Sequence, residues 1–370
     1  MMLKLKKKFK LIILFIILIF IYLFIFNSIN NFISPFHYKQ NYNFSLNTNY
    51  FYINNTKNQF FFLNKEKLEL CKNFGIFIYN YPHNKRIAKY GNIGDYIQSL
   101  AALQYLPNNC IPNFVDRDNI EFYNNSKSKI ILIMNSWNII RYGNRKVPNI
   151  IYPIYISYHI SNTNSIKSIS INNLKKYQPI GCRDKFTEKA LIKKGIDAYF
   201  SSCLTTTLDM SFAVEDFERT NEIIFIDYKF GMMPLADKFI KSLKKYDFNK
   251  IIYINHTYKL KKYTHLERFK LAKKLLDRYA KAKLVISTRI HGALPCLAFN
   301  TPVILINKRY DKRFPGLYEL LNTIGIDSKG EFKINVLLNK ENMVVNCKKY
   351  LKYATRLKKK IKMMIANIKL

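Results

Sequence analysis

Short apolar runs alternate with amphipathic stretches along most of the chain after residue 70. The apolar runs are rich in Ile, Leu and Phe, and they occupy residues 74–80, 130–135, 223–228, 251–255, 284–287 and 303–307. Their length and composition predict buried strands. Between them, apolar residues at helical spacing predict helices over 95–106, 184–194, 235–243 and 265–280. This alternation predicts an α/β fold with parallel sheets that carry helices on both faces.

The strand and helix alternation occurs twice along the chain. We therefore predict two successive Rossmann-like domains, an N-terminal one at 71–212 and a C-terminal one at 213–340. Ligands of such sheets bind beyond the carboxyl ends of the strands. Two stretches with polar side chains, GNIGD at 91–95 and STRIH at 287–291, lie at such ends. We expect both stretches to belong to one site.

The N-terminus combines a lysine-rich tail with a long apolar run. Five lysines within residues 1–10 precede the uncharged stretch LIILFIILIFIYLFIF at 11–26. As a helix this stretch spans about 24 Å at ~1.5 Å per residue, and an uncharged extension to Ile33 brings it to the ~30 Å of a bilayer core. We predict a transmembrane signal anchor at 11–33, followed by a stem or linker at 34–70.

The lysines also predict the orientation of this anchor. Under the positive-inside rule, residues 1–10 form a cytoplasmic tail and the body of the chain lies on the lumenal or extracytoplasmic side. A cleaved signal peptide is the alternative, but no small-residue cleavage site follows the apolar run. The predicted localisation is thus a single-pass membrane protein, with the membrane as a partner through 11–33.

The C-terminal segment 341–370 predicts a basic amphipathic helix. Its apolar residues recur at helical spacing and its other face is rich in lysine. Two interpretations fit this pattern. The helix either packs on the body with a solvated face, or lies on an anionic membrane surface.

The charge balance is strongly basic, with 61 Lys and Arg against 24 Asp and Glu and a net charge of +37. Such a charge is compatible with nucleic acid, a membrane surface or acidic substrates. The lysines are scattered, however, and no zinc-finger, RNP-like or P-loop pattern is present. We therefore expect no nucleic-acid partner and attribute much of the excess to the Asn-, Ile- and Lys-rich composition typical of AT-rich genomes.

The cysteines give no sign of a metal site. The six of them include no C-x-x-C pair and no zinc-ligand spacing. Cys182, Cys203 and Cys296 stand in apolar surroundings, which predicts core positions. We predict no bound metal and no cofactor.

The stretch GNIGD carries the first candidate residue, Asp95. Gly91 and Gly94 allow the backbone to approach a ligand closely, and Asp95 follows at the start of a predicted helix. One interpretation is an N-cap, which stabilises a helix by about 0.5–2 kcal/mol. The other is a carboxylate that moves a proton to or from a sugar hydroxyl.

The stretch GCRD, at 181–184, carries the second candidate residue. Arg183 follows a predicted strand and precedes a helix that Asp184 is expected to cap. An Arg–Asp neighbour pair at a helix start is commonly a surface ion pair of little energetic value. A guanidinium directly after a strand end indicates a pocket instead.

The stretch STRIH carries the third and strongest candidate site. Arg289, Ile290 and His291 begin a helix that Pro295 is expected to interrupt. A helix N-terminus carries about half a positive charge and unpaired N–H donors. With a guanidinium and an imidazole added, this junction is suited to hold an anion such as a phosphate or a carboxylate. A plain helix start with an incidental His is the alternative.

Together the three stretches, in this order and spacing, resemble the polysaccharide pyruvyl transferase family. GNIGDYIQSLAA resembles its N-terminal motif, the block from PIGCRD to TTTLD resembles its central motif, and STRIHGALPCLAFNTPVILI resembles its C-terminal Arg-x-His motif. The likeness covers roughly residues 72 to 310. It leaves out the predicted anchor, stem and basic tail.

The resemblance implies a fold and an activity. The fold would be GT-B-like, with two Rossmann-like domains facing across a cleft. The activity would be transfer of pyruvate from phosphoenolpyruvate to two hydroxyls of a glycan sugar, forming a cyclic ketal and releasing phosphate. Partners would be the donor phosphoenolpyruvate and an oligo- or polysaccharide acceptor.

The resemblance also implies roles for individual residues. Arg183, Arg289 and His291 match the residues proposed to bind the donor, and the predicted donor site also includes Ile290 and the loop residues Asn92 and Gly94. We expect His291 to act as the acid and Asp95 as the base. Two alternatives stay open at this point. They are a GT-B-type nucleotide-sugar glycosyltransferase and a membrane-tethered glycan-binding protein without catalytic activity.

Overall fold

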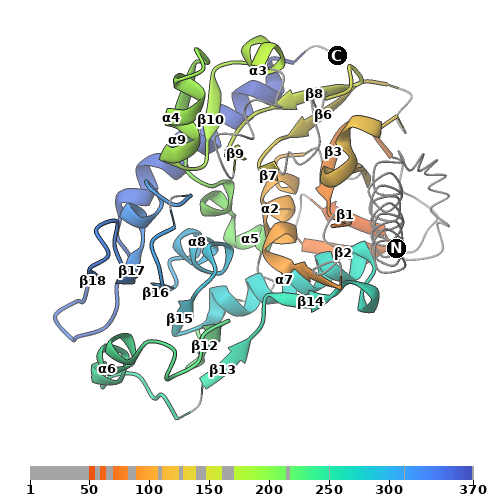
Figure 1. Ribbon diagram of the computed structural model, residues 1–370. Helices are drawn as coiled ribbons and strands as arrows, with labels where there is room; N and C mark the ends of the chain where they lie inside the picture. Colours follow the sequence, from red (N-terminus) through yellow and green to blue (C-terminus); the bar gives the residue numbers. More distant parts are fainter. Residues whose placement is uncertain are drawn as a thin grey trace, which may run out of the picture. The chain divides into compact units, whose positions relative to one another are not determined.

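The computed structural model describes most of the chain from residue 50 onward (Figure 1). The described residues are 50–54, 59–63, 70–81, 89–106, 111–124, 128–138, 147–160, 171–213, 217–249, 251–311 and 313–368. The predicted tail and anchor at 1–33, and much of the predicted stem, lie outside them. None of the described helices is both long and apolar enough to cross a membrane. Asn49–Leu370 group as one compact unit, and the predicted division near residue 212 stays a prediction.

The first parallel sheet lies in the N-terminal half. Its described strands run in the order β5-β3-β6-β8, with bounds β3 (Leu70–Ile78), β5 (Ile111–Asp116), β6 (Ile130–Ile133) and β8 (Ile151–Ile154). All three pairings are parallel. Strands predicted at 74–80 and 130–135 are therefore confirmed. Because parallel sheets are covered on both faces, their strands read as nearly continuous apolar runs.

The second sheet lies in the C-terminal half, with described strands in the order β13-β12-β15-β16-β17-β18 (Figure 1). The strands are β12 (Ile223–Ile226), β13 (Ile251–Ile254), β15 (Leu284–Ser287), β16 (Val303–Asn307), β17 (Asn322–Ile326) and β18 (Phe332–Asn335). All neighbours pair in parallel except β17 and β18. The mixed α/β fold with parallel sheets is thus as the alternating pattern predicts.

The helices connect the strands and cover the sheets. They are α2 (Ile93–Leu103), α3 (Ile171–Lys176), α4 (Lys185–Ile192), α5 (Met210–Ala213), α6 (Pro234–Ser242), α7 (His265–Lys281), α8 (Ile290–Ala298) and α9 (Lys349–Ala366). Helix α7 begins at a capping box in which Thr264 and Glu267 bond each other's backbone N–H groups. Helix α8 continues through Pro295, so the expected interruption is wrong.

Several short strand pairs complete the described fold. They are β1 (Tyr50–Asn54) with β2 (Gln59–Leu63), β7 (Trp137–Asn138) with β9 (His159–Ile160), and β10 (Ile180–Cys182) with β11 (Ala198–Phe200). The β10–β11 pair is parallel. It matters for function because β10 ends at the residue before Arg183.

One short strand pair joins residues from the two halves of the chain. Strand β4 (Tyr90–Asn92) pairs antiparallel with β14 (Thr257–Lys259). Directly after β4, the N–H of Ile93 donates to the carbonyl of His256 at 2.8 Å. The ring of Tyr258 lies so close to Gly91 that a side-chain carbon at this position would clash with it. The stretch GNIGD at 91–95, which we call the glycine loop, is thereby held by the C-terminal half of the chain.

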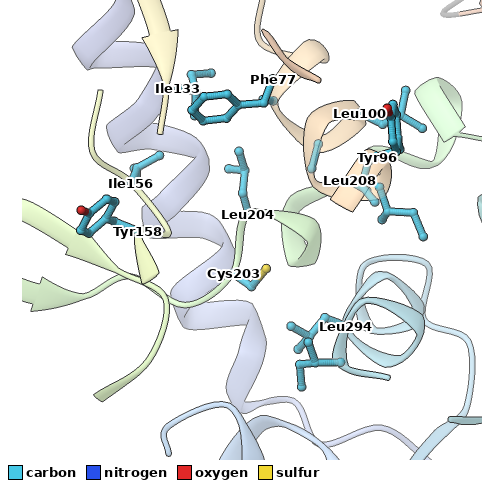
Figure 2. Packing of buried hydrophobic residues seen from close by; sticks show 14 of the residues in the cluster. Phe77, Tyr96, Leu100, Ile133, Ile156, Tyr158, Cys203, Leu204, Leu208 and Leu294 are labelled. Atoms are coloured by element: carbon cyan, nitrogen blue, oxygen red, sulfur yellow. The ribbon is translucent and has the colours of Figure 1, made fainter. Parts of the chain in front are cut away.

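A shared hydrophobic core also joins the two halves. The 3-10 segment Leu204–Thr207 packs against α2, α8 and α9. Figure 2 shows Cys203 and Leu204 between Ile156 on one side and Leu294 of α8 on the other. Cys203 is fully buried, as are Cys182 and Cys296. The predicted core positions of these cysteines are therefore confirmed.

The C-terminal helix α9 packs on the body with one face. Tyr350, Ala354, Leu357 and Ile361 are buried and belong to the main hydrophobic cluster. Leu351 falls outside this face, with 47% of its surface exposed. These contacts agree with the interpretation of the tail as a helix that packs on the body and leaves its other face to solvent.

We predict that Gly91→Ala destabilises the fold by about 1–3 kcal/mol, because the added methyl group overpacks against the ring of Tyr258. Urea unfolding measures the loss. A second substitution, Tyr258→Ala, removes the obstructing ring, so the double variant should lose less than the sum of the single losses. If the losses of the two single variants add up in the double variant, the contact with Tyr258 is not what makes a larger residue unfavourable at Gly91.

Candidate functional site

The glycine loop places Asn92, not Asp95, at the cap of α2. The Asn92 side chain accepts a hydrogen bond from the N–H of Gly94 at 3.1 Å. Asp95 lies in the first turn of the helix. The N-cap interpretation of Asp95 is therefore wrong, because the amide side chain two residues before Gly94 already satisfies this role. The carboxylate of Asp95 has other partners.

Asp95 lies in a buried polar cluster and is only 7% exposed. Tyr81 donates its hydroxyl to this carboxylate at 2.7 Å, and Gln98 donates its amide at 3.3 Å. Burial raises the pKa of Asp95 above its usual range, while the charge of Arg117 and the Tyr81 hydrogen bond oppose the shift. A carboxylate with a raised pKa is a stronger base once it is ionised.

Arg117 is a site residue that the sequence did not single out. It directly follows β5, its side chain is almost fully buried, and Nη1 lies 3.9 Å from a carboxylate oxygen of Asp95. Its other nitrogens bond Asp118 at 2.9 and 3.2 Å, and the guanidinium lies over the ring of Tyr79. Burial alone lowers the pKa of Arg117, but the neighbouring carboxylates outweigh it and raise the pKa. Arg117 thus provides a permanent positive charge beside Asp95.

Arg183 is buried at the end of β10, with 4% of its surface exposed. The Nε atom has no hydrogen-bond partner among the described residues, and the carboxylate of Asp184 lies 3.9 Å away. Burial lowers the pKa of Arg183, although Asp184 opposes this. The surface-pair interpretation is therefore wrong. A buried guanidinium with an unpaired donor is costly unless an anion completes its hydrogen bonds.

Asp184 caps α4, as predicted, and also orients an imidazole. It accepts the N–H of Thr187 at 2.8 Å, and its second oxygen lies 2.6 Å from Nδ1 of His159. Burial lowers the pKa of His159 to about 4, and the charge of Arg183 adds to this effect. The sequence pattern did not identify His159, because β9 is only two residues long and has no periodicity to reveal its buried face.

Arg289 forms the N-cap of α8 at the carboxyl end of β15. Its side chain is 46% exposed and forms an ion pair with Asp227, which follows β12. A further nitrogen lies 3.4 Å from the hydroxyl of Thr257 in β14. Asp227 is therefore the partner that any anion bound to Arg289 must displace or share.

His291 lies in the first turn of α8 and is 6% exposed. Its Nε2 atom has no hydrogen-bond partner in the part of the chain that is described. Burial lowers the pKa of His291 well below 6.5, and the charges of Arg183, His256 and His159 act in the same direction. This imidazole is neutral at pH 7, and electrostatic coupling links it to a guanidinium from the N-terminal half.

The glycine loop and the start of α8 are in close contact. A side-chain carbon built on Gly94 would lie 3.0 Å from Cβ of His291, a tight contact that a residue larger than glycine fits only if its neighbours shift. Ile290, in contrast, belongs to the hydrophobic core. Any contribution of Ile290 to donor binding therefore falls to its backbone N–H.

The predicted site residues thus fall into one connected group and one neighbour. Asp95, Arg183 and His291 come from different elements, and the charge of Arg183 lowers the pKa of both Asp95 and His291. Arg289 lies beside this group, held by Asp227. No group of three His, Cys, Asp or Glu side chains suited to a metal occurs within the described ranges. The arrangement offers buried cations, a neutral imidazole and a buried carboxylate, which suits anion binding with proton transfer.

Comparison with solved structures gives two distant likenesses. A functionally uncharacterized protein from Klebsiella pneumoniae has 13% identity and a TM-score of 0.34, over 65% of this chain and 85% of that one. The UDP-GlcNAc 2-epimerase of Methanocaldococcus jannaschii, solved with UDP-GlcNAc and UDP, has 11% identity and a TM-score of 0.32, over 77% and 99%. Both scores are too low to carry an argument. A search of curated proteins found no match.

Comparison with family models gives a direct match. The model for polysaccharide pyruvyl transferase matches residues 92–308, which is more than half of the 370 residues. The match begins at Asn92 of the glycine loop and extends past His291, so it includes all three stretches on which the resemblance rests. It identifies the chain as a transferase and implies a polysaccharide acceptor. The chain belongs to the polysaccharide pyruvyl transferase family.

Proposed function

We propose that this protein transfers pyruvate from phosphoenolpyruvate to two hydroxyls of one glycan sugar, forming a cyclic ketal and releasing phosphate. The main support is a pair of buried side-chain nitrogens that lack a hydrogen-bond partner in the described part of the chain. The Nε of Arg183 and the Nε2 of His291 have no hydrogen-bond partner among the described residues. They come from the two sequence halves, which we propose to be two Rossmann-like, GT-B-like domains that face across a cleft.

The charge of the donor matches the charge of the site. Phosphoenolpyruvate carries a phosphate and a carboxylate, which together hold close to three negative charges. A single guanidinium would leave much of this charge uncompensated at a buried site, where desolvation is costly. Arg183, Arg289 and the N-terminus of α8 together provide two full positive charges and unpaired N–H donors.

The reaction requires two proton transfers that balance. One proton adds to the methylene carbon of the donor, which becomes the methyl group of the ketal, while a sugar hydroxyl attacks the adjacent carbon. Phosphate then leaves, and a second hydroxyl of the same sugar closes the ring and gives its proton to the departing phosphate, so the two hydroxyl protons lost equal the two gained by the methylene carbon and the phosphate. We assign the proton donor to His291 and the base for the attacking hydroxyl to Asp95. The negative charge of the donor favours the imidazolium, so we propose that donor binding raises the pKa of His291 from its lowered value and lets the imidazole take up the proton.

The remaining expectations about cofactors, partners and localisation stay proposals. We propose that phosphoenolpyruvate acts as a substrate without a further cofactor. We also propose that residues 11–33 anchor the chain in a membrane with the body on the lumenal or extracytoplasmic side. Because phosphoenolpyruvate is made in the cytosol, this orientation would require donor import. Protease protection of the body in sealed vesicles tests the orientation.

The proposed function is tested by incubating the purified protein with phosphoenolpyruvate and a panel of galactosides and mannosides. We expect phosphate release by ³¹P NMR and a ketal methyl signal in the ¹H spectrum of the acceptor. Consumption of a nucleotide sugar, with no phosphate release from phosphoenolpyruvate, would instead establish the alternative, a GT-B-type glycosyltransferase.

We predict that Arg289→Ala and His291→Ala each lower the rate of ketal formation by at least about a hundredfold, because each removes a group that acts on the donor. Initial rates of phosphate release measure the loss. Arg278→Ala is the matched control, since Arg278 forms a similarly exposed ion pair with Glu222 at the opposite end of β12. A His291→Ala variant that folds and keeps near-wild-type turnover contradicts the assignment.

We predict that Arg183→Met raises the pKa of His291. The guanidinium disfavours the imidazolium, so its removal should make protonation easier, whereas Arg278→Met should leave the pKa unchanged. NMR titration of ¹³C-labelled histidine measures the pKa, with assignment by His291→Gln. If His291 of the wild-type protein titrates at 6.5 or above, the proposal that it is neutral before the donor binds is wrong.

A further inference from the structure

A pocket lies outside the proposed donor site, between β11 and the C-terminal helix α9. It has a volume of about 490 Å³ and is lined on the strand side by Tyr199, Phe200 and Ser201. Helix α9 contributes Tyr353, Arg356, Leu357, Lys359, Lys360 and Met363. None of these residues belongs to the polar groups around Asp95, Arg183 and His291. The pocket therefore needs an explanation of its own.

The pocket combines aromatic rings with positive charge. The rings of Phe200 and Tyr353 meet edge to face with centroids 5.1 Å apart. Arg356, Lys359 and Lys360 supply cations, and the described lining includes no carboxylate. The ammonium of Lys360 lies 3.6 Å from the ring centroid of Tyr199. Burial lowers the pKa of Lys360 although the charge of Asp197 opposes the shift, so this cation is partly desolvated and gains from a further anionic partner.

The pocket and the donor site share the β10–β11 strand pair. Phe200 pairs with Cys182, the residue immediately before Arg183. The hydroxyl of Ser201 donates to the carbonyl of Cys182 at 3.0 Å. Paired strands lie about 4.8 Å apart. Strand β11, which forms one wall of the pocket, is therefore adjacent to β10, which ends at the residue before Arg183. The strand pair thus connects the pocket wall to the element that carries Arg183.

We propose that this pocket binds the pyruvylated product, through a glycan sugar that carries the carboxylate of its ketal. The inference rests on the proposed function. Each transfer converts a neutral sugar into one with a negative charge and adds a methyl group. Aromatic faces suit the apolar faces of the sugar and the ketal methyl, and the cations pair with the new carboxylate. Unmodified acceptor lacks this charge and binds less tightly.

Such a product site would keep a modified chain attached while its next repeat reaches the donor site. Holding one end of a polymer raises the effective concentration of its neighbouring repeats, without any new contact at the reacting sugar. Ketals should then accumulate on the same chains. At equal total phosphate release, some chains should carry many ketals while others carry none.

The binding test uses the full-length protein and chemically prepared disaccharides. One ligand carries a 4,6-pyruvate ketal on galactose, and the other is the same disaccharide without it. Isothermal titration should show tighter binding of the ketal form, with a loss of about tenfold in the double variant Arg356→Gln/Lys359→Gln. Both side chains are exposed, so the fold should persist, and a thermal melt checks this. Lys352→Gln, an exposed α9 residue outside the pocket, is the matched control.

A polymer experiment measures the consequence. At equal phosphate release, the double variant should spread ketals evenly over the chains, whereas the Lys352→Gln control should keep the clustered distribution.

Equal affinity for the two disaccharides, or a double variant that binds like wild type, overturns the inference. A third outcome also overturns it: the double variant binds the ketal ligand like wild type but no longer binds phosphatidylglycerol vesicles. That result would assign the cations of the pocket to a membrane surface. The titration needs no turnover, so its outcome is separate from a failure of phosphoenolpyruvate-dependent transfer.

Discussion

The candidate site depends on the contact that holds the glycine loop against the C-terminal half of the chain. Strand β4 pairs with β14, the N–H of Ile93 bonds the carbonyl of His256, and Gly94 lies against His291. The start of α2 and the start of α8 therefore lie together, although almost two hundred residues separate them in the chain. Without this contact, Asp95 and His291 would belong to separate surfaces. The glycines suit this contact, because a side-chain carbon at Gly91 would clash with Tyr258 and one at Gly94 would press on His291 at the start of α8.

Desolvation is the second determinant of the site. Arg117, Arg183, His159 and His291 are all buried, and each would be easier to solvate at a surface. Arg117 is compensated by Asp118 and Asp95, and His159 by Asp184. Buried nitrogens of Arg183 and His291 lack a hydrogen-bond partner among the described residues, as does Nη1 of Arg117. Uncompensated buried polar groups are rare in stable proteins, and they concentrate where a ligand completes them. The buried nitrogens without partners are therefore stronger support for an anionic substrate than the net charge of the whole chain.

Much of the fold could be predicted from local pattern, and some of the site could not. The strands at 284–287 and 303–307 have the predicted bounds, because fully buried parallel strands read as continuous apolar runs. The motif residues Asp95, Arg183 and His291 were identified because each stretch stands at a predicted helix start, after glycines or the end of a predicted strand. Arg117 and His159 were missed, since each stands next to a short element without periodicity. The family resemblance drawn from the motifs is confirmed by the family match.

The sequence by itself determined the α/β class, the alternation of strands and helices, and the family, because these depend on periodicity and on local motifs. Only the tertiary structure decided that Asn92 rather than Asp95 caps α2, that Arg183 is buried, and that His291 is held neutral. It also decided that α9 and β11 enclose a basic, aromatic pocket. The physical reason is the same in each case. Burial and charge coupling depend on which side chains meet across long sequence separations, and no local pattern carries that information.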